Sequence, residues 1–128
     1  MYSPNLSDIP SIPGQPPRLG VLASGSGTNF DAIASEIDDD QLEAEIACMV
    51  CNNEDAGAFD IAERHGVVSE LVDHRQFDER AAFDDTVMTV LESYEVEWVI
   101  MAGWMRLMSP HFIDAWEGRI LNIHPSLL

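Results

Sequence analysis

The 128-residue sequence contains no lysine: its six basic residues are all arginines, set against 23 aspartates and glutamates. Without a lysine amine, the chain can neither form a Schiff base with a substrate nor build a lysine-containing Walker phosphate loop. The formal net charge of −17 repels phosphate backbones and anionic lipid surfaces. We therefore expect neither a nucleic acid nor a membrane as a partner. A small anionic substrate would have to be held by backbone amides or by a few well-placed arginines.

Long apolar runs and targeting patterns are also missing. The apolar run at residues 98–102 has only the length of a buried strand, and residues 1–17 match neither a secretory nor an organellar signal. The two cysteines, Cys48 and Cys51, stand three positions apart on an expected strand and would point to opposite faces. We predict that both are buried apolar fillers without a shared metal or a mutual disulfide. These features favour a reducing cytoplasm.

The length suits one domain, and five of the seven prolines precede Arg18. Residues 1–17 are therefore predicted to be a flexible, proline-rich leader, and residues 18–128 a single domain. Strands and helices alternate through that domain. Strands are expected at 19–23, 44–51, 67–72, 98–102 and 119–124, and helices at about 28–37, 56–65, 79–94 and from 110 onward. This order predicts an α/β fold: an open, mostly parallel sheet with helices on both faces. In such sheets, ligands bind at the carboxyl ends of the strands, near the point where strand order reverses.

A glycine-rich turn, GSGTNF at residues 25–30, follows the first expected strand and opens a helix. Such a turn presents free backbone amides at the positive end of the helix dipole, which favours an anion. A dinucleotide fingerprint would need a third glycine in place of Phe30, so a single phosphate is the better ligand. Thr28 and Asn29 would add side-chain donors, or would cap the helix. The alternative interpretation is a tight strand-to-helix turn without a ligand.

The segment GWMRLMSP at residues 103–110 follows the fourth expected strand and holds one arginine, Arg106, among large apolar side chains. It would suit one wall of a pocket for a flat heterocycle or a carboxylate. The alternative is a buried connection with a solvated arginine, and composition alone favours that alternative.

The last expected strand carries Asn122 and His124, which are two residues apart and so share one face. An amide donor beside an imidazole suits the stabilisation of an oxyanion and the movement of a proton. The alternative is a structural polar pair at the end of an edge strand.

The other three histidines carry less information. His65 is interpreted as a favourable charge near a helix C-terminus. His74 and His111 lack partners at metal-ligand spacing, so no metal site is expected.

Together the stretches VLASGSGTNFDAI, MAGWMRLMSP and RILNIHPSLL, in this order, resemble the folate-dependent phosphoribosylglycinamide formyltransferase family. The resemblance extends from Arg18 to Leu128. It implies a Rossmann-like formyltransferase fold and transfer of a formyl group from 10-formyltetrahydrofolate to the amine of glycinamide ribonucleotide, in de novo purine synthesis. It implies no metal.

The resemblance also assigns roles to individual residues. Gly27, Thr28 and Asn29 would bind the phosphate of glycinamide ribonucleotide. Asn122 and His124 match the catalytic amide and the general acid. The residues implied for folate binding are Arg80, Met105, Arg106, Leu107, Met108 and Asn122.

Members of the family continue beyond the position of Leu128, and the continuation carries an aspartate that pairs with the histidine. We therefore expect the chain to be the amino-terminal portion of an enzyme, lacking the C-terminal part, with low or no turnover alone. An unpaired imidazole titrates at about 6.5 and is mostly neutral at cellular pH. An exposed sheet edge after the fifth strand could drive formation of a homodimer.

Four alternatives stay open. Formyltetrahydrofolate deformylase resembles the chain around Asn122 and His124, but it usually has a second histidine in place of Pro125. Methionyl-tRNA formyltransferase shares the final motif but lacks the phosphate turn, and the acidity of this chain suits tRNA poorly. A non-catalytic phosphate-binding fragment is the third alternative. A dehydrogenase is the weakest, because Asn52 and Asn53 stand where a ribose-binding carboxylate is expected.

Overall fold

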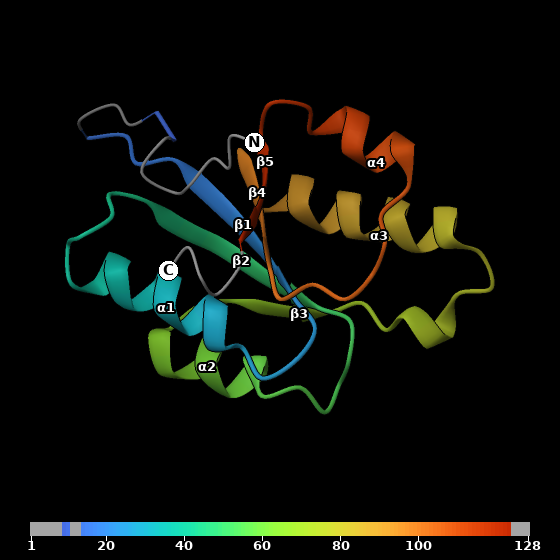
Figure 1. The fold of residues 1–128 in the computed structure, drawn as a ribbon, viewed down its shortest axis with the longest axis horizontal. Helices are drawn as coiled ribbons and strands as arrows, with labels where there is room; N and C mark the ends of the chain where they lie inside the picture. The colour runs from blue at the N-terminus through green and yellow to red at the C-terminus, as the bar shows by residue number, and fades with distance from the viewer. Residues whose placement is uncertain (1–8, 11–13, 124–128) are drawn as a thin grey trace.

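The computed structural model describes residues 9–10 and 14–123, and in that part of the chain five parallel strands form one sheet. The elements are β1 (Arg18–Ala23), α1 (Thr28–Asp38), β2 (Glu45–Cys51), α2 (Ala58–His65), β3 (Ser69–Leu71), the 3-10 helix η2 (His74–Gln76), α3 (Arg80–Ser93), β4 (Trp98–Ala102), α4 (Pro110–Ala115) and β5 (Ile120–Ile123). The strand order is β3-β2-β1-β4-β5. The predicted open, parallel α/β architecture is confirmed (Figure 1).

Helices cover both faces of the sheet, so the strands are apolar on both sides. Helices α1 and α2 pack on one face through a core that includes Phe30 and Ile33, and α3 and α4 pack on the other through a core that includes Phe83 (Figure 1). Cys48 and Cys51 are buried free thiols that belong to opposite cores. The prediction that these cysteines are buried fillers on opposite faces is therefore confirmed.

The helix that follows the glycine-rich turn begins differently from the prediction. Gly27 occupies the N-cap position of α1 with φ +83°, and no side chain caps the helix. The expectation that Thr28 or Asn29 caps it is wrong. The reason is tertiary, because a Cβ on Gly27 would lie 2.8 Å from the Cα of Ala58 in α2. Only glycine combines the left-handed backbone with this close approach of α2.

The remaining boundaries differ from the prediction by small shifts. Gly66 ends α2 in the left-handed conformation with φ +68°. Strand β3 has three residues instead of the six expected at 67–72. It lies at the edge of the sheet and pairs only with β2 among the described strands, so its pattern of apolar residues is a weak guide to its length.

Residues 1–8, 11–13 and 124–128 lie outside the described part of the chain. Within the predicted leader, the described residue Ile9 is buried in the core that covers the α1 side of the sheet. The assignment of residues 1–17 as a flexible leader stays a prediction. None of the described helices is both long and apolar enough to span a membrane.

Candidate functional site

Strand order reverses between β1 and β4, where the first and second halves of the sheet meet. The glycine-rich turn follows β1 and the 103–109 segment follows β4, so both emerge at the same edge. Between them lies a cavity of about 410 Å³, lined by residues 25–29 together with Ala102, Gly103 and Met105. The structure thus brings the predicted phosphate residues Gly27, Thr28 and Asn29 together with the predicted folate residue Met105.

The turn at residues 25–29 leaves donors available to an anion. Since α1 has no side-chain cap, no described side chain occupies the amides of its first turn. Those amides lie at the positive end of an 11-residue helix. The hydroxyls of Ser26 and Thr28 lie 2.9 Å apart and add two polar groups beside the amides. The turn is therefore chemically suited to a phosphate.

The 103–109 segment packs on α3 through aromatic rings. Trp104 stacks on Phe83, with ring centroids 6.1 Å apart, and the Arg106 guanidinium carbon lies 5.6 Å from the centroid of Phe83. The Trp104 indole donates a hydrogen bond to the sulfur of Met108 over 3.1 Å. The guanidinium of Arg106 is thus placed on an aromatic face instead of extending freely into water.

The folate residues implied by the resemblance have different environments. Met105 is 82% exposed and Leu107 is 74% exposed, whereas Met108 is buried in the core beneath the segment. Arg80 is exposed at the first residue of α3. Of these residues, only Met105 lines the cavity beside the turn.

Two side chains from outside the 103–109 segment fix it by hydrogen bonds, and sequence reasoning missed both contacts. The Ser24 hydroxyl accepts from the Met105 amide over 2.9 Å, and the Asp84 carboxylate accepts from the Ser109 amide over 2.7 Å. Asp84 is buried, although it is acidic. A signal for it exists in the sequence, since this carboxylate sits beside Phe83 on the apolar face of α3, where an acid requires a partner.

Asn122 lies near the end of β5, next to the cavity-lining strand β4. Its partner across the sheet is Met101, while Ile123 pairs with Ala102 of the cavity wall. Leu121 and Ile123 are buried and Asn122 is exposed, so these three side chains alternate between the two faces of the sheet. His124 lies outside the described residues, and its position beside Asn122 stays a prediction.

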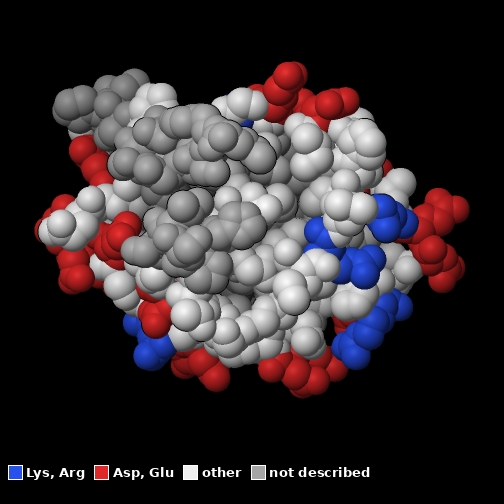
Figure 2. All heavy atoms as spheres, in the orientation of Figure 1, with Lys and Arg blue, Asp and Glu red and all other residues white. Residues whose placement is uncertain are grey.

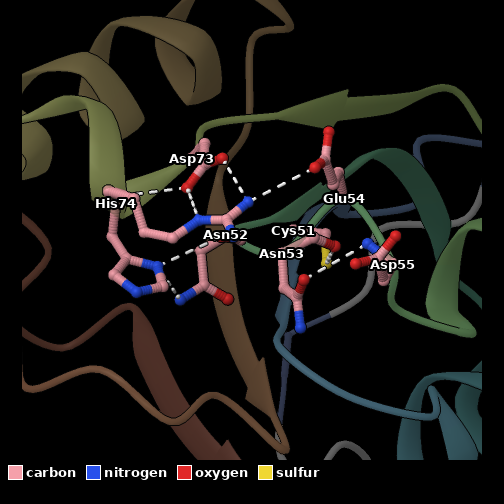
Figure 3. A network of polar contacts seen from close by, with 8 residues as sticks. Cys51, Asn52, Asn53, Glu54, Asp55, Asp73 and His74 are labelled. Carbon is pink, nitrogen blue, oxygen red and sulfur yellow. Dashed lines mark hydrogen bonds and ion pairs between the residues drawn. The ribbon is translucent and has the colours of Figure 1, made fainter.

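A second polar cluster joins the carboxyl ends of β2 and β3 (Figure 3). The Asn52 side-chain nitrogen lies 3.2 Å from His74 Nδ1, and Asn52 is buried. Asp73 accepts three hydrogen bonds from Arg75, whose guanidinium lowers the pKa of that carboxyl to about 2. These contacts stabilise the loops beside the strands. Across residues 9–10 and 14–123, no group of three or more histidine, cysteine or acidic side chains is arranged to hold a metal ion.

His65 connects the two helices on the α1 side of the sheet. Its Nε2 lies 2.7 Å from an Asp31 oxygen and its Nδ1 lies 2.6 Å from an Asp38 oxygen. The hydrogen bond to Asp31, supported by Asp38, raises the pKa of His65 although partial burial opposes the shift. The sequence predicted a charge near the C-terminus of α2, and the structure adds two acidic partners on α1.

The surface charge does not by itself attract an anion to the cavity. On the face shown in Figure 2, acidic side chains are scattered around the periphery and arginines gather in only a few places. With a net charge of −17, long-range attraction of an anion is weak. An anion bound here would depend on short-range hydrogen bonds from the turn.

Comparison with known proteins gives a consistent picture. The trifunctional purine biosynthetic protein adenosine-3 of Gallus gallus is 42% identical over 111 residues, covering 87% of this chain and 11% of that protein. The phosphoribosylglycinamide formyltransferase of Bacillus subtilis (strain 168) is 35% identical over 111 residues, covering 87% of this chain and 57% of that protein. The crystal structure of glycinamide ribonucleotide transformylase 1 from Geobacillus kaustophilus superposes with a TM-score of 0.82 at 37% identity, covering 87% of this chain and 59% of that one.

The chain therefore spans little more than half of the single-function relatives it matches, and a far smaller share of the trifunctional ones. The family model for formyl transferases matches residues 17–128, which include the turn, the 103–109 segment and Asn122. Because that match extends over nearly the whole sequence and the fold agrees with it, the chain belongs to the formyl transferase family.

Proposed function

We propose that the chain forms the phosphate-binding and folate-binding walls of a phosphoribosylglycinamide formyltransferase. The observation that carries this proposal is the cavity at the strand reversal, where the uncapped turn at 25–29 faces Met105 across a space of about 410 Å³. The substrates would be glycinamide ribonucleotide and 10-formyltetrahydrofolate. The relatives that bear this activity in their names support the assignment.

In this proposal, the first-turn amides of α1 and the hydroxyl of Thr28 hold the ribonucleotide phosphate. The folate lies along the 103–109 segment, where Met105 and Leu107 expose apolar surface to a flat ring. Arg106 and Arg80 supply cations for the carboxylates of the folate tail. The turn at 25–29 and the 103–109 segment then hold the amine and the formyl group close together.

The reaction is an acyl transfer. The amine lone pair attacks the formyl carbon, the C=O electrons move to oxygen, and a tetrahedral intermediate forms. The Asn122 amide donates a hydrogen bond to that oxygen, and protonated His124 stabilises its negative charge. When the carbonyl re-forms, the bond to the folate nitrogen breaks and that nitrogen takes up a proton relayed by His124. The proton lost by the attacking amine balances the one taken up by the leaving nitrogen.

Binding and turnover are measured separately. Titration calorimetry with glycinamide ribonucleotide tests the turn, and a formyl-transfer assay with 10-formyltetrahydrofolate tests the chemistry. Thr28→Ala is expected to weaken ribonucleotide binding by about tenfold, the equivalent of one charge-assisted hydrogen bond. Asn122→Ala is expected to lower any formyl-transfer rate that the unsubstituted chain shows by about a hundredfold or more, with little effect on that binding.

Asn53→Ala serves as the matched control, because Asn53 is an exposed asparagine whose side chain bonds only to the nearby Asp55 amide among the described residues. It is expected to change neither measurement. If the unsubstituted chain binds neither ligand, the proposed function is wrong. Formate release without the ribonucleotide would indicate a deformylase instead. Binding of the ribonucleotide without folate binding or turnover would indicate a non-catalytic phosphate-binding fragment.

The wider setting belongs to the same proposal. Two buried free cysteines suit a reducing cytoplasm. The high acidity favours small-molecule substrates over nucleic acid or membrane surfaces. Strand β5 lies at one edge of the described sheet, so self-association into a homodimer would use that edge. Sedimentation velocity over a range of concentrations tests for the dimer.

A further inference from the structure

We propose that Ser24 is a positioning residue that couples the turn at residues 25–29, called the phosphate cradle below, to the 103–109 segment. Binding of a ligand at one of these two sites then strengthens binding at the other. This inference rests on the proposed function, since it needs two ligands. It assigns a role to a residue that would not itself touch either ligand.

Ser24 immediately precedes the turn and makes two hydrogen bonds to the 103–109 segment. Its amide donates to the Gly103 carbonyl over 3.3 Å, and its hydroxyl accepts from the Met105 amide over 2.9 Å. The register between β1 and β4 ends at Leu22 and Met101. Ser24 therefore extends the connection between the two strands into the loops that form the cavity.

The Ser24 hydroxyl links the phosphate cradle directly to the opposite wall of the cavity. Ser24 is 8% exposed and its hydrogen bond to the Met105 amide is partly buried, so water has limited access to this bond. Ser24 immediately precedes the cradle residues 25–29, and Met105 lies on the opposite wall of the same cavity. A displacement of the turn thus reaches Met105 through one side chain.

The far end of the segment is held independently. Buried Asp84 accepts from the Ser109 amide, and the Trp104 indole donates to Met108 within the segment. Loss of the Ser24 hydroxyl would release only the end of the segment that faces the cradle. The remaining contacts keep the rest of the segment on α3, so a Ser24 variant is expected to fold.

The coupling follows from shared ordering. An anion in the cradle restrains residues 25–29, and Ser24 transmits that restraint to the backbone at Met105. Folate then binds a segment that is already ordered and loses less conformational entropy. By linkage, folate must strengthen anion binding by the same factor.

The test measures the dissociation constant of folic acid by calorimetry, with and without saturating glycinamide ribonucleotide. For the unsubstituted chain, we expect the ribonucleotide to tighten folic acid binding by about fivefold, as for one net hydrogen bond. Ser24→Ala is expected to bring that ratio to about one and to weaken folic acid binding by about fivefold when the ribonucleotide is present. Ser24→Thr keeps the hydroxyl and is expected to restore the coupling.

Ser93→Ala is the matched control, since the Ser93 hydroxyl bonds only within the end of α3 among the described residues. Amide hydrogen exchange gives a readout that needs no ligand: exchange at Met105 should accelerate in Ser24→Ala, while exchange at Ser109 should not. If the alanine variant does not fold, Ser24→Cys takes its place in both measurements, because the thiol is similar in size to the hydroxyl group but is a weaker hydrogen-bond acceptor.

Three results would overturn the inference. One is an unsubstituted chain whose two ligands bind without influencing each other. Another is a Ser24→Ala chain, or a Ser24→Cys chain in its place, that retains the full coupling. The third is unchanged exchange at Met105 in that variant. A chain that binds neither ligand refutes the proposed function itself, and this result differs from binding without coupling.

Discussion

Replacing Gly27 by alanine should destabilise the chain more than any other single glycine-to-alanine change in the turn. Gly27 has φ +83°, and the left-handed conformation costs a non-glycine residue about 1–2 kcal/mol. The added Cβ would also lie 2.8 Å from the Cα of Ala58, a backbone atom that can move only if α2 moves. Such overpacking costs about 1–3 kcal/mol. The free energy of unfolding should therefore fall by about 2–5 kcal/mol.

Urea unfolding followed by circular dichroism measures this loss. With a slope of about 2 kcal/mol per molar urea, the midpoint should fall by about 1–2.5 M. Gly66→Ala separates the two causes, because Gly66 has φ +68° but nothing within 4 Å of its added Cβ. It should lose only about 1–2 kcal/mol. Gly25→Ala, with open space and no positive φ, should change the stability by less than about 1 kcal/mol.

The difference in stability between Gly27→Ala and Gly66→Ala measures the effect of the close approach of α2. If Gly27→Ala is no more destabilising than Gly66→Ala, the close approach of α2 does not constrain the turn. The tertiary explanation for the glycine cap of α1 would then be refuted.

Two further predictions follow from the titrating groups. Hydrogen bonds to Asp31 and Asp38 raise the pKa of His65 in the folded chain above its ordinary 6.5, which is its pKa in the unfolded chain. The stabilisation that protonated His65 provides is therefore complete below the pKa of the unfolded chain, and it is lost as the pH rises through the pKa of the folded chain. His65→Gln should therefore lower the urea midpoint relative to the unsubstituted chain at about pH 6 but not at about pH 9; equal losses at both pH values would contradict the ion-pair explanation. Burial raises the pKa of Cys48 to about 12, so iodoacetamide at about pH 8 should label it far more slowly in the folded chain than in urea, as measured by mass spectrometry. Equal labelling rates would show that this thiol is accessible.

Most of the fold was predictable because its signals are local. Trp98–Ala102 is apolar on both faces and is bounded by Glu97 and Gly103, so the predicted and observed strands agree. Strand β3 was predicted too long. Val68 is apolar and β-branched but half exposed, because the edge of the sheet has neighbours on one side only. A residue pattern cannot distinguish an edge position from a central one when the strand is so short.

The site was predictable in outline and not in detail. The topology places whatever follows β1 beside whatever follows β4, so the turn and the 103–109 segment had to meet. The contacts that fix their geometry join residues far apart in the sequence: Ser24 with Met105, and Asp84 with Ser109. Neither pairing leaves a local periodic signal. The acidic partners of His65 were missed for the same reason, since they lie on a different helix.

The central position of β1 in the sheet affects how the chain folds while it is synthesised on the ribosome. Among the described strands, β1 is made first, yet its second neighbour, β4, is the fourth to be synthesised. A nascent chain that ends before Trp98 has β2 beside β1 but leaves the opposite edge of β1 unpaired. Until Met105 has emerged, the cavity lacks one of its two walls. A small molecule that occupies this cavity between its two walls can therefore stabilise the five-stranded sheet, but it cannot assist the earlier steps of its assembly.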